Sequence, residues 1–541
     1  MNKLTYFQRG DSKGMGFSNN NDRFGEIAFF GFLIAVGFFV TLLFLRLFQL
    51  TIVKGEYYRT LSENNRIREI LIEPKRGEIL DRKGFVVVKN LDPQIEESFA
   101  QIKKDGGRIV SKRIYETPEA IAPLIGYRQL ADANDLKNDD CLFKLQPGDK
   151  VGKKGAEKIF NCALKGQPGK KLIEVDAKGK YLRTITVIPP IDGQNIQMSF
   201  DWELQKKAYQ LLQGKKGAII ATDPKTGEVL TLASSPSFNP QDFEDGNNVG
   251  KYFLDKNQPL FNRVTEGTYP PGSLFKLIVA TAALEEKAID EKTQFEDKGI
   301  IHAGSLTFGN WYYLEYGKTE GMVDIVKAIK RSNDIFFYEA GAKTGVDKIK
   351  KWADIYGLGQ KTNIGLEENE GLVPSPFWKE ATLHDQWYTG DTYNFSIGQG
   401  YLGVTPIQMN QVTSTIANNG VQCQPQLLKD AKPSCHKLPI SQKTLDLIKE
   451  GMKEACTTGG TGWPLFDFKA KNGPIQTSCK TGTAESTQAQ SGQPHAWITD
   501  FAPSDNPQIV VTVLVENGGQ GSDVAGPIAK EFLKTYFERS Q

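Results

Sequence analysis

Residues 27–45, IAFFGFLIAVGFFVTLLFL, form a run of nineteen residues without a charged side chain. As an α-helix this run would be roughly 28 Å long, which matches the hydrocarbon core of a bilayer. A buried core helix is the alternative, but no polar face interrupts the run. No small-residue cleavage site follows it, which disfavours a cleaved signal peptide. The sequence predicts a cytoplasmic tail over residues 1–26 and one transmembrane anchor over residues 27–47.

Basic residues flank the run on both sides, so the excess of positive charge that marks the cytoplasmic side does not decide the orientation. The basic residues before the run are Lys3, Arg9, Lys13 and Arg23, and those that follow it are Arg46, Lys54, Arg59, Arg66 and Arg68.

The six cysteines fall in pairs that are close in sequence: Cys141 with Cys162, Cys423 with Cys435, and Cys456 with Cys479. Disulfides would fit an extracytoplasmic compartment, although six cysteines admit fifteen pairings and buried free thiols are the alternative. None has the spacing of a zinc site. We expect the bulk of the chain outside the plasma (inner) membrane, and we expect a Cys456–Cys479 bridge beside Lys480 from position alone.

The composition is that of an ordinary globular protein of 541 residues, 39% of them hydrophobic. Lys and Arg total 66 against 64 for Asp and Glu, a net charge of +2, so a nucleic-acid partner is not expected. Residues 48–195 are mixed and charged and carry no catalytic pattern, which predicts a pedestal or dimerisation-type interaction domain. We expect a second domain over residues 196–541.

Strand patterns occur at both ends of this second domain. The turn PKTG lies between the strand patterns GAIIATD and EVLTLAS. Near the C-terminus, the turn SDNP lies between HAWITDFAP and QIVVTVLVEN. Helical patterns fill the interval, and PIAKEFLKTYFER closes the chain as an amphipathic helix. The fold class is therefore α/β (α+β), with an antiparallel sheet covered by helices.

Lys276 is the only charge between Ser273 and Leu284 in the stretch TYPPGSLFKLIVATAALEEKA. Pro271 and Gly272 predict a turn, after which a helix would place Ser273 and Lys276 on one face. An ammonium in an apolar helix is costly unless it is paired or neutral. The alternative is that Lys276 reaches the surface or pairs with a carboxylate.

Each short motif is weak alone. SCHK at Ser434 also matches Ser-x-x-Lys, but it lies in a loop-like stretch. Lys-Thr-Gly occurs at Lys225, Lys343 and Lys480. Lys225 lies in a hairpin turn and Lys343 at a helix end, whereas Lys480 precedes the terminal strands, where it predicts an edge strand beside an active site.

The order of the motifs is more specific than any one of them. Ser273-x-x-Lys276 opens an apolar helix, Ser332-Asn333-Asp334 follows, and Lys480-Thr481-Gly482-Thr483 precedes the last hairpin. This set resembles the penicillin-recognising serine acyltransferases. With NRVTEGTYPPGSLFK, GDTYNFSIGQGYLGVTPIQM and PKRGEILDRKG, the chain resembles the class B penicillin-binding proteins, most closely the elongation-type penicillin-binding protein 2.

The resemblance implies a peptidoglycan D,D-transpeptidase with the penicillin-recognising serine transpeptidase fold. Ser273 would attack the D-Ala-D-Ala carbonyl of a stem peptide, and Lys276, neutral through burial and the nearby Lys480, would be its base. Ser332 would relay the proton. β-Lactams would acylate Ser273.

The same resemblance assigns the substrate carboxylate to Lys480, Thr481 and Thr483, and the oxyanion to the backbone N–H groups of Ser273 and Thr483. Gly482 would let the substrate approach the strand, and Asn333 would bind substrate. No metal or other cofactor is implied. Of the four histidines, His302 could lie near Glu296 and Asp297, but such a trio is more often ordinary polar surface.

Asp334 departs from the many relatives that have Asn at this position. An ionised carboxylate near Lys276 would favour the protonated lysine and oppose its role as base. Either Asp334 points toward substrate amides or the pair exchanges protons during turnover. A rival register, Arg331-Ser332-Asn333, supplies Asn but loses the first Ser, so we prefer the register that starts at Ser332.

Other functions sharing these motifs are a division-type transpeptidase, a membrane-anchored β-lactamase or β-lactam sensor, and a non-catalytic scaffold that activates a glycan polymerase. The anchor and pedestal disfavour a secreted lactamase, and the intact motifs disfavour a scaffold. We expect a role in elongation and cell shape, with a polytopic peptidoglycan glycosyltransferase and other elongation-complex membrane proteins as partners.

Overall fold

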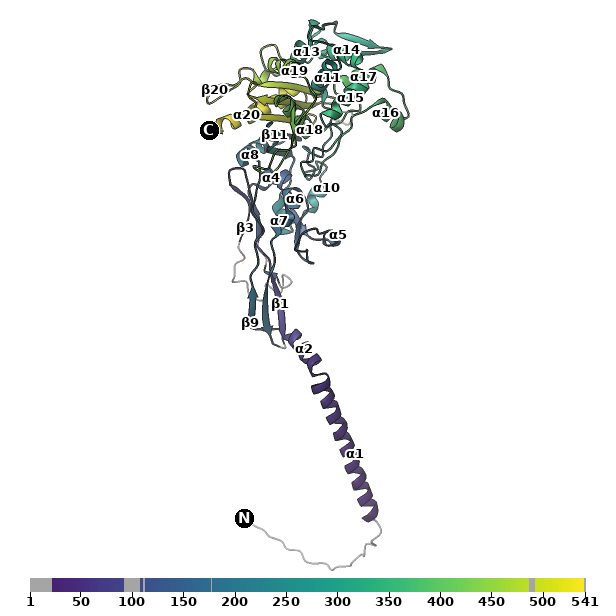
Figure 1. The fold of residues 1–541 in the computed structure, drawn as a ribbon, viewed down its shortest axis with the longest axis vertical. Coiled ribbons are helices and arrows are strands. Elements are labelled where there is room, and N and C mark those ends of the chain that lie inside the picture. The colour runs from purple at the N-terminus through teal and green to yellow at the C-terminus, as the bar shows by residue number, and fades with distance from the viewer. Residues whose placement is uncertain (1–21, 92–107, 110–111, 177, 486–491, 540–541) are drawn as a thin grey trace, which may run out of the picture. The chain divides into compact units, whose positions relative to one another are not determined.

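The computed structural model describes residues 22–91, 108–109, 112–176, 178–485 and 492–539, and these residues fall into two compact units (Figure 1). The described part of the first unit comprises the chain up to Ile72, Arg108 and residues 170–189; the rest forms the second unit. The cytoplasmic tail falls almost wholly outside the described residues. Its boundaries, with those of the anchor, pedestal and catalytic domain, remain a proposal.

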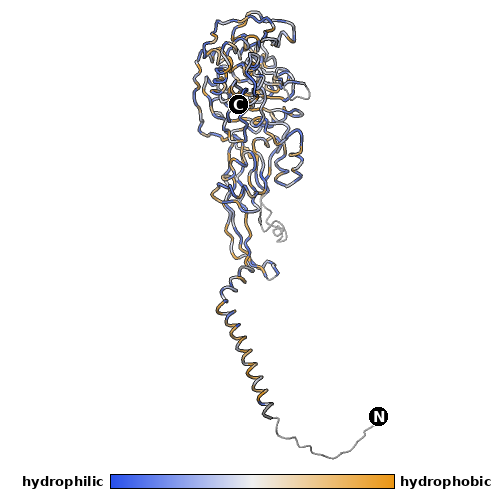
Figure 2. Tube along the Cα trace, turned by 90° about the vertical axis from the view of Figure 1, so that its right-hand side faces the viewer, coloured by the Kyte–Doolittle hydropathy of each residue, from blue (hydrophilic) through white to orange (hydrophobic). Residues whose placement is uncertain are grey.

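The first unit begins with helix α1 (Asp22–Phe48), a π-helical turn η1 (Gln49–Val53) and α2 (Gly55–Arg66). Figure 2 shows mostly hydrophobic residues along α1, and its side chains are exposed on all sides. Within the described residues, one helical segment, Gly25–Val53, is long and apolar enough to cross a membrane. Residues 27–47 lie inside it.

A four-stranded sheet follows, in the order β4–β1–β8–β9. Its strands are β1 (Ile67–Ile72), β4 (Arg108–Ile109), β8 (Gly169–Val175) and β9 (Tyr181–Ile188). Strands β8 and β9 pair antiparallel, and Glu174 of β8 forms ion pairs with Arg66 and Arg183.

The second unit contains a four-stranded sheet in the order β10–β2–β3–β5, which is smaller than the five-stranded main sheet of this unit. Its strands are β2 (Ile79–Leu80), β3 (Val86–Leu91), β5 (Lys112–Tyr115) and β10 (Ile196–Gln197). A pair β6 (Arg128–Leu130) and β7 (Lys150–Gly152) and the helices α4 (Pro118–Ile125), α5 (Ala133–Lys137), α6 (Gly155–Ile159) and α7 (Asn161–Lys165) lie beside it in sequence.

Buried ion pairs stabilise this region. The Glu157 carboxylate accepts from Arg76 at 2.6 Å and from Arg113 at 2.8 Å, and all three side chains are almost fully buried. Arg128 forms two 2.7 Å bonds with Glu244 of α9. Since a buried charge without its partner costs several kcal/mol, the Glu157 pairs hold Arg76 and Arg113 together, and the Arg128–Glu244 pair joins β6 to α9 (Pro240–Asp245) of the same unit.

The main sheet has five antiparallel strands in the order β12–β11–β23–β22–β21. They are β11 (Gly217–Thr222), β12 (Val229–Ser235), β21 (Ser478–Ala484), β22 (His495–Ala502) and β23 (Ile509–Val515). The two predicted hairpins are confirmed, as is the edge position of the strand that carries Lys480. Strands from both ends of the domain thus meet in one sheet.

Alternate residues of these strands enter two hydrophobic cores, as a period of two requires. One face packs on α8 and α20 through residues such as Ile498 and Val511. The opposite face, including Trp497 and Leu514, packs into a larger core with α11, α14, α18 and α19. The predicted arrangement of a sheet covered by helices is confirmed (Figure 1).

The helices of the second unit that follow the smaller sheet in sequence are α8 (Trp202–Leu211), α9 (Pro240–Asp245), α10 (Gly250–Leu254), α11 (Lys276–Glu285), α12 (Trp311–Tyr316), α13 (Ile325–Arg331), α14 (Asp334–Thr344), α15 (Val346–Ile355), α16 (Pro376–Leu383), α17 (Thr389–Ser396), α18 (Pro406–Ala417), α19 (Gln442–Ala455) and α20 (Gly526–Arg539). Short two-stranded sheets lie between them: β13 (Phe295–Asp297) with β16 (Gly321–Val323), β14 (Ile300–Ala303) with β15 (Leu306–Gly309), β17 (Val421–Cys423) with β18 (Cys435–Lys437), and β19 (Lys469–Ala470) with β20 (Gly473–Pro474).

All six cysteines form disulfides, and the pairs are the three that are close in sequence. The Cys456–Cys479 bridge joins the end of α19 to β21, one residue before Lys480. A Cβ at Gly462 would lie 2.3 Å from the Cys479 sulfur, so only glycine fits beside this bridge. The disulfide therefore braces the start of the strand that carries Lys480.

Asp500 of β22 is a fully buried acid on the face of the main sheet that carries Cys479. It pairs across the strands with Cys479 and Val511, and among the described residues neither carboxylate oxygen has a hydrogen-bond partner. Burial raises the pKa of Asp500 well above its usual range.

Because the native state retains this proton while the unfolded chain loses it, Asp500 should lower stability as the pH rises above about 4. We expect the thermal midpoint of Asp500→Asn to rise relative to the wild-type protein between pH 4 and pH 8. Thermal unfolding of the full chain in detergent measures this difference. Asp505→Asn, in the exposed turn after β22, is the control, and equal pH slopes for Asp500→Asn and the wild type would contradict the prediction.

Candidate active site

Ser273 lies in a short 3₁₀ turn, η2 (Gly272–Leu274), directly before α11, and it is half-buried. Gly272 has φ of 54°, and a Cβ there would lie 2.8 Å from the Thr483 carbonyl oxygen of β21. Its N–H donates to the Gly398 carbonyl at 3.0 Å. Glycine is therefore required for the turn to approach the edge strand, and this approach brings Ser273 to β21.

Lys276 is the first residue of α11, and its side chain is completely buried. Its Nζ donates to Asp334 Oδ1 at 2.6 Å and to the Ser332 carbonyl at 2.7 Å. Burial lowers the pKa of Lys276, and the Asp334 carboxylate partly opposes that effect. Lys276 thus pairs with a carboxylate, as in the alternative given above, and its side chain stays away from the surface.

Ser332 ends α13 in a left-handed backbone conformation, with φ of 53° and ψ of 37°. Glycine or asparagine is the usual residue there, because a Cβ makes this conformation unfavourable. The Ser332 hydroxyl lies between two amines: Nζ of Lys480 at 2.8 Å and Nζ of Lys276 at 3.4 Å. The hydroxyl thus provides a reason for a strained serine at this position.

Lys480 is also completely buried, on β21. Besides Ser332, its Nζ donates to the Thr481 carbonyl at 2.9 Å. Burial and the neighbouring Lys276 lower its pKa well below the usual value. Two lysines and one serine from three distant segments therefore form one continuous hydrogen-bonded cluster.

Asp334 begins α14 and completes this cluster. Its Oδ1 accepts from Lys276, and its Oδ2 accepts the backbone N–H of Trp311 at 2.8 Å. Both oxygens are used within the protein, so the carboxylate faces the lysine and not a substrate amide. Asp334, and not Asn333, contacts Lys276, which favours the register that starts at Ser332.

Asn333, which stands between Ser332 and Asp334 in the sequence, is fully buried. Its Oδ1 caps α14 by accepting the Phe336 N–H at 2.8 Å, and its Nδ2 donates to Asp297 at 2.9 Å. These contacts favour a positioning role over the substrate binding that we expected from the motif.

No sequence pattern marks the residues that support this cluster. Asn310 accepts the Asp334 N–H at 3.1 Å, and Asp297 binds both Asn310 and Asn333. Asp297 belongs to the trio that we interpreted as ordinary polar surface, but it is buried. No spacing pattern links residues 297 and 310 to residue 334, because only tertiary packing brings them together.

The rest of the third motif lies along β21. Thr481 Oγ1 donates to Thr461 Oγ1 at 2.9 Å, whereas Thr483 is exposed and its Oγ1 accepts the Gly521 N–H at 3.3 Å. A Cβ at Gly482 would lie 2.6 Å from Leu274. Glycine is thus needed for the Ser273 turn to pack on the strand.

Comparison with known proteins agrees with this geometry. The model of the penicillin binding protein transpeptidase domain matches residues 217–534. The chain belongs to this transpeptidase family. The penicillin-binding protein dimerisation domain matches residues 107–198.

The family's relatives extend over nearly the whole chain. Peptidoglycan D,D-transpeptidase MrdA of Salmonella typhimurium is 31% identical over 92% of this chain and 93% of its own. The penicillin-binding protein PBP2 of Helicobacter pylori, solved with MreC, has a TM-score of 0.74 at 29% identity and covers 88% of this chain and 99% of that one. A chain from a peptidoglycan synthase complex, described as coordinating polymerization and crosslinking, has a TM-score of 0.74 at 29% identity. It covers 96% of this chain and 99% of that one.

The chain is therefore a class B peptidoglycan D,D-transpeptidase of the elongation type, and the family, fold and enzyme class expected from the motifs are confirmed.

Ser332→Gly separates the role of the hydroxyl from that of the backbone. We expect a change in stability of no more than about 1 kcal/mol, because glycine relieves the left-handed strain while the buried Lys480 loses a hydrogen-bond acceptor. We also expect acylation by a fluorescent penicillin to be about 100-fold slower, because the hydroxyl between the two lysines is lost. Gln258→Gly, at an exposed position with the same φ of 53°, is the control that should gain stability with unchanged acylation.

Asp334→Asn tests the electrostatic role of the carboxylate. Its negative charge raises the pKa of Lys276, so removing it should lower that pKa further. If acylation requires neutral Lys276, the acidic limb of the pH–rate profile should move to lower pH. The rate of labelling by a fluorescent penicillin between pH 5 and pH 10 measures this limb, and a shift to higher pH would contradict the assignment.

Proposed function

We propose that Ser273 is the nucleophile of this transpeptidase and that Lys276 is its general base. The observation that carries the proposal is the buried cluster Asp334–Lys276–Ser332–Lys480, next to the turn that holds Ser273 against β21. Because burial lowers the pKa of Lys276, a larger fraction of this amine is neutral and able to accept the serine proton.

In the acylation step, Ser273 Oγ attacks the carbonyl carbon of the D-Ala-D-Ala peptide bond while its proton moves to Lys276. The C–N bond then breaks, and Ser332 passes a proton to the departing D-alanine amine. Deacylation runs in reverse: an amine of a second stem peptide attacks the acyl-enzyme, gives up a proton through the same residues, and Ser273 regains its own.

We propose that β21 binds the substrate backbone and its terminal carboxylate. Lys480, Thr481 and Thr483 supply cationic and hydroxyl donors, and the exposed Thr483 is the most accessible of them. The N–H groups of Ser273 and Thr483 would hold the oxyanion. Gly482 keeps the strand close to the Ser273 turn, and Asn333 positions Asp334.

We also infer that the chain is anchored in the plasma (inner) membrane by residues 27–47, with the catalytic domain outside. Three disulfides support an oxidising compartment. The MreC complex of the Helicobacter pylori relative and the related synthase complex support elongation-complex membrane proteins, including a polytopic glycosyltransferase, as partners. Stem peptides and β-lactams are the proposed ligands of the active site.

Labelling with a fluorescent penicillin tests both the nucleophile and the orientation. We expect the full chain in detergent to form a slowly decaying adduct, and Ser273→Ala to form none. Ser434→Ala, at the second Ser-x-x-Lys sequence, is the matched control and should label normally. In spheroplasts, a penicillin that does not cross the plasma membrane should label the same protein. Labelling that persists in Ser273→Ala, or rapid release of the adduct, would contradict the proposal.

A further inference from the structure

A polar pocket of about 450 Å³ lies outside the catalytic cluster, in the second unit. Its walls come from the end of α15 and the loop after it, from Gln411 of α18, and from the segments around β17 and β18. Five of its lining side chains are amides: Gln360, Asn363, Gln411, Gln422 and Gln424. None of the lining residues belongs to the active site described above.

One wall of the pocket is a disulfide-linked hairpin. Cys423 pairs with Cys435 across β17 and β18, and Gln422 pairs with His436. Because side chains alternate along a strand, Gln422 and His436 face away from the two cysteines. Gln424 and Ser434 lie two positions from Gln422 and His436 and also line the pocket. The hairpin therefore presents one polar face.

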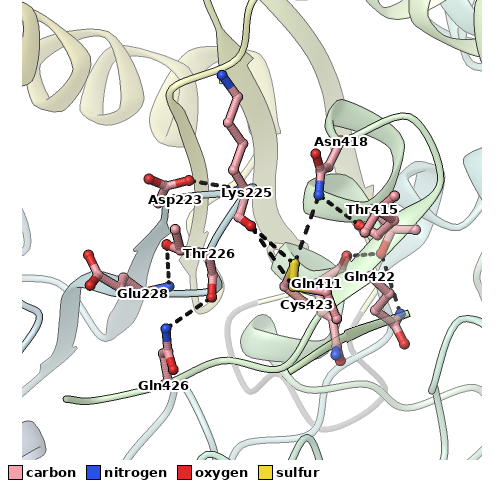
Figure 3. Close-up of a disulfide and its surroundings, with 12 residues drawn as sticks. Asp223, Lys225, Thr226, Glu228, Gln411, Thr415, Asn418, Gln422, Cys423 and Gln426 are labelled. Carbon is pink, nitrogen blue, oxygen red and sulfur yellow. Dashed lines mark hydrogen bonds between the residues drawn. A yellow bond between two sulfur atoms is a disulfide. The ribbon is translucent and has the colours of Figure 1, made fainter. Parts of the chain in front are cut away.

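The opposite face of the hairpin is fixed to the rest of the domain. The Cys423 sulfur lies 3.4 Å from the backbone carbonyl oxygen of Lys225 in the β11–β12 turn, and Figure 3 shows this contact. A covalent link between two paired strands reduces their freedom to separate. The polar wall is thus held in place whether or not a ligand is bound, which lowers the cost of ordering it on binding.

Hydrogen bonds also join the hairpin to the second wall of the pocket, which is the end of α15 and the loop after it. Gln422 Nε2 donates to the Tyr356 carbonyl at 2.9 Å, and Gln424 Nε2 donates to the Asn363 carbonyl at 2.6 Å. Both bonds use amide N–H groups of the glutamines, and an amide has two such groups and an acceptor oxygen. The side chains are therefore held in position. Gln422 Nε2 also donates to Thr415 Oγ1 at 3.4 Å, so the amide N–H group of this pair that remains for a ligand is on Gln424.

The chemistry of the lining selects the class of ligand. Ile355 is the one apolar side chain among the lining residues, which leaves little surface for a hydrophobic ligand. Of the charged lining residues, Asp354 is paired with Lys350 at 2.7 Å and Lys361 is the one base, and His436 adds a group that donates and accepts. Amides and hydroxyls match a neutral ligand that is rich in hydroxyl and N-acetyl groups.

We propose that this pocket binds the glycan strand of peptidoglycan, a neutral polymer of N-acetylated amino sugars. Such a site goes beyond the proposed cross-linking chemistry, since it holds the strand to which stem peptides are attached. Binding the strand at a second point raises the effective concentration of its stem peptides near the active site. The pocket volume is within the range of small-ligand sites and accommodates a short part of the strand.

A β-1,4-linked tetramer of N-acetylglucosamine is a suitable probe, titrated by calorimetry into the full chain in detergent. We expect saturable binding that is weakened at least about tenfold in the double variant Gln411→Leu and Gln424→Leu, which removes two amides at nearly constant volume. The single variant His436→Ala, at an exposed residue, should weaken binding to a smaller extent.

Gln213→Leu, at an exposed glutamine outside the pocket, is the matched control and should bind the tetramer normally. Penicillin labelling of Ser273 should be unchanged in every variant, which reports correct folding and tests the active site separately. Absence of saturable binding by the wild-type protein would overturn the proposal. So would undiminished binding by the variants, or displacement of the tetramer by a free stem peptide.

Discussion

The burial of two lysine side chains against one serine hydroxyl is the interaction on which the active site depends. Lys276 and Lys480 both approach Ser332 Oγ, and both are completely inaccessible to solvent. An isolated buried ammonium costs several kcal/mol, and two of them repel one another. The site meets this cost in two ways: Asp334 pairs with Lys276, and burial lowers the pKa of both lysines.

This arrangement answers the conflict between a base and a neighbouring acid. Asp334 favours the charged form of Lys276, but desolvation is the larger effect and acts in the opposite direction. Asp334 is itself held by the Trp311 N–H. The carboxylate therefore orients the lysine and moderates its pKa without fixing the lysine in the protonated state.

Close backbone packing brings this chemistry to Ser273. Gly272 and Gly482 allow the turn and the edge strand to meet, and Gly398 lies against the same turn, where a Cβ would be 2.1 Å from the Gly272 carbonyl. The Cys456–Cys479 disulfide braces the strand one residue before Lys480. Precise placement of a nucleophile relative to its base depends on such rigid supports.

The sequence by itself determined the membrane-length helix, the two terminal hairpins, the edge position of β21 and the order of the three motifs. These features are local, because strand alternation, turn residues and helical spacing act between near neighbours. Tertiary structure alone decided that Asp334 faces Lys276, and that Asp297 and Asn310 support Asn333 and Asp334. It also selected one disulfide pairing out of fifteen. Contacts such as Lys276–Asp334, 58 positions apart, and Ser332–Lys480, 148 positions apart, leave no periodic pattern in the chain, since they form only when the sheet and its helices pack.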